Sequence, residues 1–254
     1  MTASASTRGR VLGLGLFTLV LVAVLVGLGL WQLQRRSEKH ALIAVLDTRL
    51  AAAPVPLPDP RTWASLSPAR DEFRRIVLTA TFAKAPQARV YASGSAIRPD
   101  VSGPGIWAFA PAHLPTGETI AVNRGFVPDL IQQGKPAEIP APPEGVVQLT
   151  GYLRFPETAG ALTPAADSGK RLWFVRDPQA MGAALGWGAD GSRLAPFYVD
   201  LESPVPPGGV PKPGPLQVRL KDDHMQYAIT WFGLAAVVAL AFLAWLRGQM
   251  RKPA

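Results

Sequence analysis

The chain has 254 residues, enough for one large domain or two small ones, and its lack of cysteine excludes a thiol nucleophile, an iron–sulfur cluster and a thiolate zinc site. Its formal net charge of +8 could suggest a nucleic-acid partner. Residues 37–223, however, hold 19 basic and all 18 acidic side chains, so the excess charge lies near the ends of the chain. This distribution argues against nucleic-acid binding.

The first predicted element is a membrane-spanning helix. Val11–Leu30 is a run of twenty residues without a charge, and Thr18 is its only polar side chain. At about 1.5 Å per residue this helix would span about 30 Å, the thickness of a bilayer's hydrocarbon core. A cleaved signal peptide would have a shorter apolar core and a small-residue cleavage site, whereas this run ends in WQLQRR. We therefore expect an uncleaved transmembrane helix over residues 11–33, preceded by a tail of residues 1–10.

Beyond the membrane, residues 34–52 are predicted to extend this helix. Leu42, Ile43, Leu46 and Leu50 would share one face, and the prolines of APVPLPDP (residues 53–60) would then end the helix. Residues 53–223 are predicted to form a β-rich domain, because short strand-like runs alternate with Pro/Gly turns, as in an antiparallel barrel or sandwich. The predicted strands are residues 75–82, 88–92, 105–110, 119–127, 146–154, 172–176, 196–201 and 215–220, with one helix at 177–186.

A second charge-free run, Tyr227–Leu246, predicts a transmembrane helix over residues 224–246, followed by a tail of residues 247–254. The alternative for both runs is a helix buried in a soluble protein. Basic residues flank both runs, and the two tails carry five of them and no acid, which favours a cytoplasmic location for both ends. The predicted fold is an α+β membrane protein, with two transmembrane helices flanking one extracytoplasmic antiparallel β-barrel-like domain.

Motifs of catalysis are missing from the sequence. There is no H-E-x-x-H, no G-x-S-x-G and no phosphate-binding G-x-x-x-x-G-K-[ST]. A Ser-His-Asp triad could still be assembled from distant residues, which leaves a membrane-anchored hydrolase as one alternative. The carboxylates do not group into an acid/base pair. We therefore expect that the protein is not an enzyme.

His224, one of three histidines, lies between the acidic residues Asp222 and Asp223 and the second apolar run, in KDDHMQYAITWF (residues 221–232). On a helix, His224, Tyr227 and Trp231 fall within one narrow stripe. Two interpretations are open. The aromatic residues could form an interfacial belt, with Asp222 or Asp223 capping the helix. Alternatively, the histidine could be the ligand of a planar cofactor that partitions into the membrane. The other two histidines, His40 and His113, are predicted to lie on solvated surfaces.

The first predicted span offers a face that could match this stripe. Small residues let membrane helices approach closely, and if they do so here, Trp31 and Arg35 would stand level with His224. An arginine beside an imidazole suits a haem, whose iron would bind the nitrogen and whose propionates would bind the guanidinium. The alternative is that the small residues face lipid. The predicted faces contain Ala23, Gly27, Trp31, Gln34 and Arg35 in the first helix, and Ala235 and Ala239 in the second.

Five segments together carry a resemblance to a known family: LGLWQLQRRSEKHALI, VNRGFVP, LTGYLR, PFYVDL and HMQYAITWFGLA. They resemble the surfeit locus protein 1 family of cytochrome oxidase assembly factors, over residues 28–246. The resemblance implies a non-enzymatic role in delivering haem a to the catalytic subunit of haem-copper oxidases. It also implies that the domain lies on the periplasmic or intermembrane-space side.

The resemblance assigns roles to particular residues. The family's histidine before the second span matches His224, the proposed ligand of haem iron, and its tryptophan closing the first span matches Trp31. Two departures are Phe126, where the family often has tryptophan, and KDDH in place of an asparagine-rich version. Asn123, Arg124 and Gly125 match the family and are predicted to be structural. The predicted haem-binding residues are His224, Trp31, Tyr227, Trp231 and Arg35.

The expected partners are oxidase subunit I and membrane lipid, with haem a synthase as a further candidate, and the expected cofactor is transiently bound haem a. We place the protein in a bacterial inner membrane, with both termini cytoplasmic and the central domain periplasmic. The rival function is a scaffold that holds the nascent subunit I without touching haem.

Overall fold

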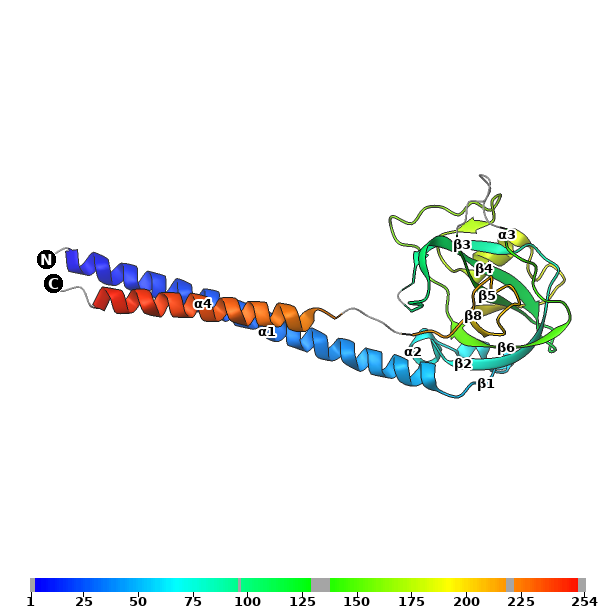
Figure 1. Cartoon of the computed structure of the whole chain (residues 1–254), viewed down its shortest axis with the longest axis horizontal. Helices are drawn as coiled ribbons and strands as arrows, with labels where there is room; N and C mark the ends of the chain where they lie inside the picture. Colours follow the sequence, from blue (N-terminus) through cyan, green and yellow to red (C-terminus); the bar gives the residue numbers. More distant parts are fainter. Residues whose placement is uncertain (1–2, 96, 129–137, 218–221, 251–254) are drawn as a thin grey trace. The chain divides into compact units, whose positions relative to one another are not determined.

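The computed structural model describes residues 3–95, 97–128, 138–217 and 222–250. It divides the chain into two compact units (Figure 1). One unit consists of Met1–Ala44 with Leu220–Ala254, and the other is Val45–Arg219. The first unit is helical and the second is built around a sheet.

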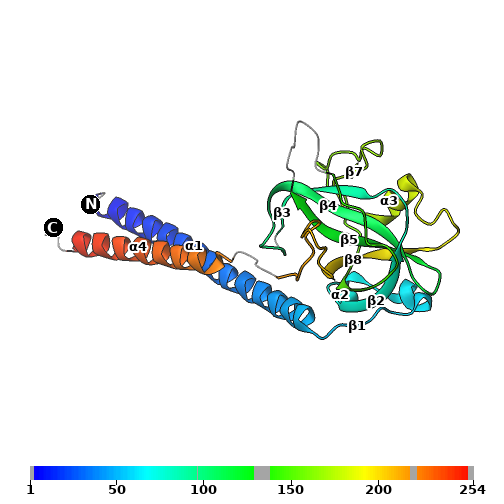
Figure 2. The same cartoon turned by 45° about the vertical axis from the view of Figure 1, so that its right-hand side comes forward.

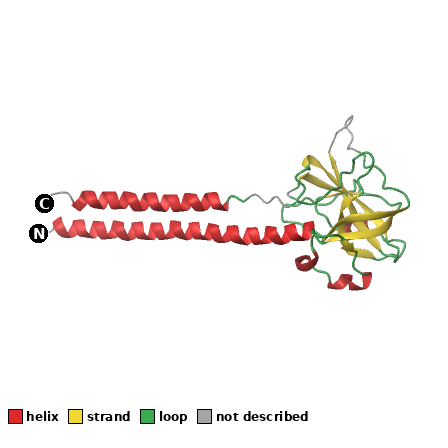
Figure 3. Ribbon diagram, turned by 60° about the horizontal axis from the view of Figure 1, so that its bottom comes forward, coloured by secondary structure: helices red, strands yellow, loops and turns green. Residues whose placement is uncertain are grey.

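Two long helices, α1 (Ala3–Ala51) and α4 (His224–Met250), lie side by side in the first unit (Figures 2 and 3). Both are long and apolar enough to cross a membrane. Only 6% of the most apolar window of each helix is buried, so neither is the core helix of a soluble domain. The apolar side chains instead point outward, as those of Phe17 and Leu240 do.

The packing of α1 against α4 differs from the predicted one. Ala23 and Gly27 are exposed, and a Cβ atom added to Gly27 would meet nothing within 4 Å. The helices instead meet at Gly29, where an added Cβ would collide with the ring of Phe232. The prediction that Ala23 and Gly27 form the contact face of α1 is therefore wrong. The helices approach closely at Gly29, because the ring of Phe232 needs the space that a residue without a side chain leaves. On α4 the prediction is correct for Ala235, which is buried.

The second unit holds one eight-stranded sheet in the order β1-β2-β6-β8-β5-β4-β3-β7. In addition, β2 pairs with β4 at Thr81 and Phe82, so the pairings β2–β6–β8–β5–β4–β2 form a closed circuit. The strands are β1 (Val55–Pro56), β2 (Arg75–Phe82), β3 (Ala88–Gly94), β4 (Ser102–His113), β5 (Thr119–Pro128), β6 (Val146–Arg154), β7 (Leu172–Trp173) and β8 (Leu194–Ser203).

The sheet is mixed, not antiparallel as predicted. The pairs β2–β6, β6–β8, β4–β5 and β3–β4 are antiparallel. The pairs β5–β8, β1–β2 and β3–β7 are parallel. Between β5 and β8 the chain is long enough to return to the opposite end of the sheet, as a parallel pair requires. Hydrophobic alternation along one strand cannot show this, because it reports which face is buried and not which way the neighbour runs.

Strand β2 illustrates how the sequence sets burial. Ile76, Leu78, Ala80 and Phe82 are buried as their period of two predicts, and they pack into a core with residues of β4, β5, β6 and β8. Fully burying such a side chain stabilises the fold by about 1.5–3 kcal/mol. A second core forms around Phe109, Trp173 and Tyr198 on the other side of β4 and β5.

The short helix predicted at residues 177–186 is α3 (Pro178–Leu185). Asp177 caps it through bonds from the amides of Gln179 and Ala180, and Gly186 ends it in the left-handed region with a φ of 73°. The prediction missed β1, a 3-10 turn η1 (Pro60–Ser65) and α2 (Pro68–Asp71), all in proline-rich sequence. The strand predicted at 215–220 is wrong for its described part, residues 215–217, and the rest lies outside the described residues.

Candidate functional site

The start of α4 is built by two aspartates. The carbonyl of Asp223 accepts the first helical hydrogen bond, from the amide of Tyr227 at 3.1 Å, and the Asp222 carboxylate accepts from the amide of His224 at 3.1 Å. The bond to the Asp222 carboxylate satisfies the amide of His224, one of the donors that the first helical turn leaves without a partner. The sequence predicted Asp222 or Asp223 as the cap of this helix, and the side chain that accepts here is that of Asp222, which helps to fix the backbone from which the His224 ring projects.

The imidazole of His224 is oriented by a side chain of α1. Its Nδ1 atom lies 2.8 Å from Oε1 of Gln32. An amide oxygen only accepts hydrogen bonds, so Nδ1 carries the proton and, in the neutral ring, Nε2 carries the lone pair. No described residue forms a hydrogen bond with Nε2. This is the arrangement that protein metal sites use, in which one ring nitrogen is held and the other is offered to the metal.

A charged group lies beside this histidine. Asp222 Oδ2 is 2.5 Å from Nε2 of His40 and 3.6 Å from Nε of Arg36. Burial acts to raise the pKa of Asp222, but hydrogen bonds from the His224 amide and from His40 outweigh it, so the pKa lies below its usual value. His40 was expected on a solvated face. Its side chain is half exposed but takes part in this cluster, which the sequence did not indicate because its partner is 182 residues away.

Trp31 and Arg35 lie on another face of α1. Trp31 is 50% exposed, the Arg35 guanidinium lies 6.0 Å from the centre of its ring, and Arg35 pairs with Glu38 at 3.0 Å. The residues that α1 presents to the start of α4 are Gln32 and Arg36, one position further along. The arginine that pairs with Asp222 beside His224 is Arg36, and the expectation that Arg35 stands next to the imidazole stays a prediction. The roles of Trp31 and Arg35 toward a haem stay predictions.

The first two aromatic residues that follow His224 on α4, Tyr227 and Trp231, differ in how far they are buried. Ala228 and Ala235 are buried, so the stripe that contains them and the half-buried Trp231 faces α1. Tyr227 is 54% exposed and lies beside this stripe. His224 is therefore flanked by one ring packed toward the helix pair and one ring available to a ligand or to lipid.

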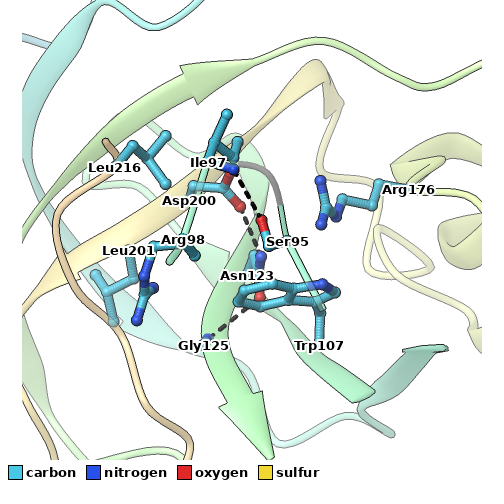
Figure 4. A pocket seen from close by; sticks show the side chains of 10 residues that line it. All are labelled: Ser95, Ile97, Arg98, Trp107, Asn123, Gly125, Arg176, Asp200, Leu201 and Leu216. Carbon is cyan, nitrogen blue, oxygen red and sulfur yellow. Dashed lines mark hydrogen bonds between the residues drawn. The ribbon is translucent and has the colours of Figure 1, made fainter. Parts of the chain in front are cut away.

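The sheet unit contains a second polar group of residues, which links β5, β6 and β8; Figure 4 shows Asn123 and Asp200 of this group. Asp200 accepts from Asn123 at 2.6 Å and from Arg154 at 2.6 Å, and Arg154 also donates to Glu72 at 2.5 Å. Burial alone would lower the pKa of Arg154, but the two carboxylates raise it above its ordinary value. All these charges are paired, as buried ions must be, so this group is structural.

Two aromatic groups complete this neighbourhood. Trp107 lies under the guanidinium of Arg176, 5.1 Å from the ring centre, and Figure 4 shows both beside Asn123 and Asp200. Burial and the nearby Asp200 raise the pKa of Tyr198. The surrounding hollow is only about 10 Å³, too small for an organic substrate. Among the described residues, no set of three or more His, Cys, Asp or Glu side chains could hold a metal ion.

Fold and site together define a protein in which two long apolar helices flank one mixed-sheet domain, with a histidine at the start of the second helix. The SURF1 family model matches residues 19–236. Surfeit locus protein 1 of Rattus norvegicus is 33% identical over 242 residues, covering 88% of this chain and 72% of the relative. The Homo sapiens protein is 33% identical over 242 residues, covering 87% and 73%. A SURF1-like protein of Monosiga brevicollis is 33% identical over 231 residues, covering 86% and 82%. The chain therefore belongs to the SURF1 family, which confirms the resemblance noted in the sequence.

Sequence reasoning missed Gln32, Arg36 and His40. A signal was present, since the three polar residues recur every four positions and so share one face of a helix. The same segment also contains Gln34, Arg35 and Glu38 on another face, and the sequence of one helix does not say which face meets the other.

Proposed function

We propose that this protein is a membrane-anchored assembly factor for haem-copper cytochrome c oxidase, and that it binds haem a through His224. Membership of the SURF1 family supports the assembly role, and nothing in the described site suggests turnover of a substrate. The protein would hold haem a and release it to subunit I, with haem a synthase as a possible donor. Haem a supplies an iron that accepts an imidazole nitrogen.

The observation that carries the haem proposal is the bond between His224 and Gln32. It places the proton of the neutral ring on Nδ1 and leaves the Nε2 lone pair for iron. Tyr227 and Trp231 would supply aromatic surface, and Arg36 is the cation beside this histidine that could meet a propionate. These residues fit a haem by the chemistry of their donors.

We further propose that α1 and α4 cross the membrane over residues 11–33 and 224–246, in a bacterial inner membrane. Their exposed apolar side chains support insertion, since in water so large an apolar surface would be unfavourable. The basic tails favour the cytoplasm, and on this proposal the sheet domain would lie in the periplasm.

The test is the absorption spectrum of the purified full-length protein after co-expression with the enzymes of haem a synthesis. We expect a Soret band that His224→Ala removes and that His113→Ala, a matched change on the sheet unit, leaves intact. Equal haem content in His224→Ala and the wild type would eliminate the ligand role. If subunit I is still captured by His224→Ala and by protein made without haem, the haem-independent scaffold is the better description.

A further inference from the structure

The sheet unit contains a cavity of about 360 Å³ that the proposed function does not use. We call it the proline pocket. One wall is the segment 204–211 after β8, and another is the segment 140–143 before β6. Six of the lining residues are prolines: Pro140, Pro143, Pro204, Pro206, Pro207 and Pro211. The volume lies in the range of small-molecule sites, about 300–1,000 Å³.

Arg124 supplies the charge of this pocket. Its side chain is 4% exposed, and its guanidinium lies 5.8 Å from the ring centre of Phe82, another lining residue. Its hydrogen bonds go to neutral acceptors: Nη1 donates to Gln87 Oε1 at 2.6 Å and to the Pro140 carbonyl at 2.7 Å, and Nη2 donates to the Ala141 carbonyl at 3.1 Å. Among the described residues, Arg124 thus has no carboxylate partner. Burial lowers its pKa to about 10, with no anion to offset the effect.

The donors of Arg124 that have no acceptor among the described residues are the ones that other arginines of this unit use to bind a carboxylate. A guanidinium has five N–H groups, and the three bonds leave Nε–H and one Nη2–H without an acceptor in the described chain. Three other arginines of this unit use Nε and Nη2 to bind both oxygens of a carboxylate, at distances of 2.7–3.0 Å. They are Arg61 with Asp59, Arg75 with Glu202 and Arg98 with Asp100. Arg124 has the same two donor atoms and lines a cavity, and no described carboxylate binds them.

We propose that the proline pocket binds an aliphatic monocarboxylate, such as a medium-chain fatty acid, with its carboxylate on Arg124 and its chain against the prolines. A buried arginine without a counter-charge is stabilised by an anion, and the planar fork suits a carboxylate. The apolar walls suit an alkyl chain. A peptide C-terminus is less suitable, because its backbone carbonyls need donors and prolines have no N–H.

The glycine next to Arg124 helps to build the pocket. Gly125 has a φ of 125°, and a Cβ there would collide with the backbone of Lys212. Phe126 and Lys212 exchange two backbone hydrogen bonds, at 3.0 and 2.7 Å. The segment 204–211 is thereby anchored onto β5 beside Arg124. These three neighbouring residues therefore have separate roles. Asn123 binds Asp200, Arg124 lines the pocket, and Gly125 leaves room for the backbone at Lys212 to cross β5.

The test uses the full-length protein held in amphipol and measures binding of carbon-13-carboxyl decanoate by equilibrium dialysis and NMR, with protein-free amphipol as the blank. We expect saturable binding, with decanol and butyrate each bound at least about tenfold more weakly, because each lacks one of the two recognised features. Arg124→Gln should also weaken decanoate binding at least about tenfold. The matched control is Arg61→Gln, a change at an exposed arginine, which should bind as the wild type does.

A second variant protects the test against misfolding of Arg124→Gln. Val205 lines the pocket and is 61% exposed, so Val205→Asp should fold and should repel the carboxylate with Arg124 still in place. Equal binding of decanoate and decanol, or unchanged binding in both folded variants, would overturn the proposal. Tighter binding of an apolar tripeptide with a free C-terminus than of decanoate would overturn the ligand class.

Discussion

Gln32 and His224 are 192 residues apart in the chain, and yet Oε1 of one lies 2.8 Å from Nδ1 of the other. The bond joins the two helices at the level where α4 begins. It also sets the tautomer of the imidazole, since the amide oxygen can only accept. Gln32, which belongs to no catalytic or metal-binding motif, thus determines which nitrogen of His224 has a lone pair for a ligand.

The first prediction concerns Gln32→Leu. Removing the acceptor frees the ring to rotate and to place its proton on Nε2, and loss of such a partner typically weakens metal binding about 10–100-fold. We expect haem affinity, measured by Soret titration, to fall at least about tenfold, and Gln32→Glu, which keeps an acceptor, to retain most of it. Gln34→Leu is the matched control, because Gln34 bonds to Glu38 instead. Equal losses in Gln32→Leu and Gln34→Leu would contradict the assignment.

The second prediction is a pH dependence set by Asp222. Its folded pKa is lowered, so the ionised form is the one that stabilises the helix pair. This contribution is complete above the unfolded value, about 4, and is lost as the pH falls through the lowered folded pKa. We therefore expect Asp222→Asn to be less stable than the wild type at pH 7, with the difference shrinking below about pH 4. Thermal unfolding followed by helical circular dichroism at several pH values measures it, and a difference independent of pH would refute the role of the charge.

The third prediction distinguishes two glycines of α1. In Gly29→Leu the new side chain collides with the Phe232 ring, and overpacking of this kind costs about 1–3 kcal/mol. In Gly27→Leu the side chain enters open space and should leave the free energy of unfolding nearly unchanged. Phe232→Ala should partly rescue the Gly29 variant, because it removes the colliding ring. Thermal denaturation of the wild type, the two glycine variants and the double variant Gly29→Leu with Phe232→Ala measures these changes in stability. Equal losses in Gly29→Leu and Gly27→Leu would show that the helices do not pack at Gly29.

Local patterns predicted the parts of the fold that depend on one segment at a time. The alternation in β2 and the short helix at residues 177–186 depend on a few neighbouring residues, and both predictions are confirmed. The parallel pairing of β5 with β8 and the face that α1 turns to α4 depend on a partner far away in the chain. For the same reason the sequence singled out His224 as a candidate ligand but not Gln32 as its hydrogen-bond partner. Gln32 and Gln34 are both glutamines in the same helical segment, and the sequence of that segment does not say which of them faces α4.

The fourth prediction concerns the buried cluster of the sheet. Asp200→Leu leaves Arg154 with one carboxylate and Nδ2 of Asn123 without its acceptor, and breaking a buried pair costs about 3–5 kcal/mol. Urea unfolding followed by tryptophan fluorescence should show this loss. Asp59→Asn, which removes an exposed ion pair with Arg61, should have a far smaller effect. If the two variants lose similar stability, the cluster does not hold β5, β6 and β8 together.

The fifth prediction compares two glycines that both have positive φ. Gly117→Ala, at φ 98°, has free space for the new methyl group and should cost only the backbone strain, about 1–3 kcal/mol. Gly125→Ala, at φ 125°, has the same strain and also collides with the backbone of Lys212, so the crossing chain must move. We expect a greater loss of stability and faster hydrogen exchange at the amides of Phe126 and Lys212, which bond to each other's carbonyls. If both amides stay protected in Gly125→Ala, then the segment 204–211 is held in place by contacts other than its crossing over β5.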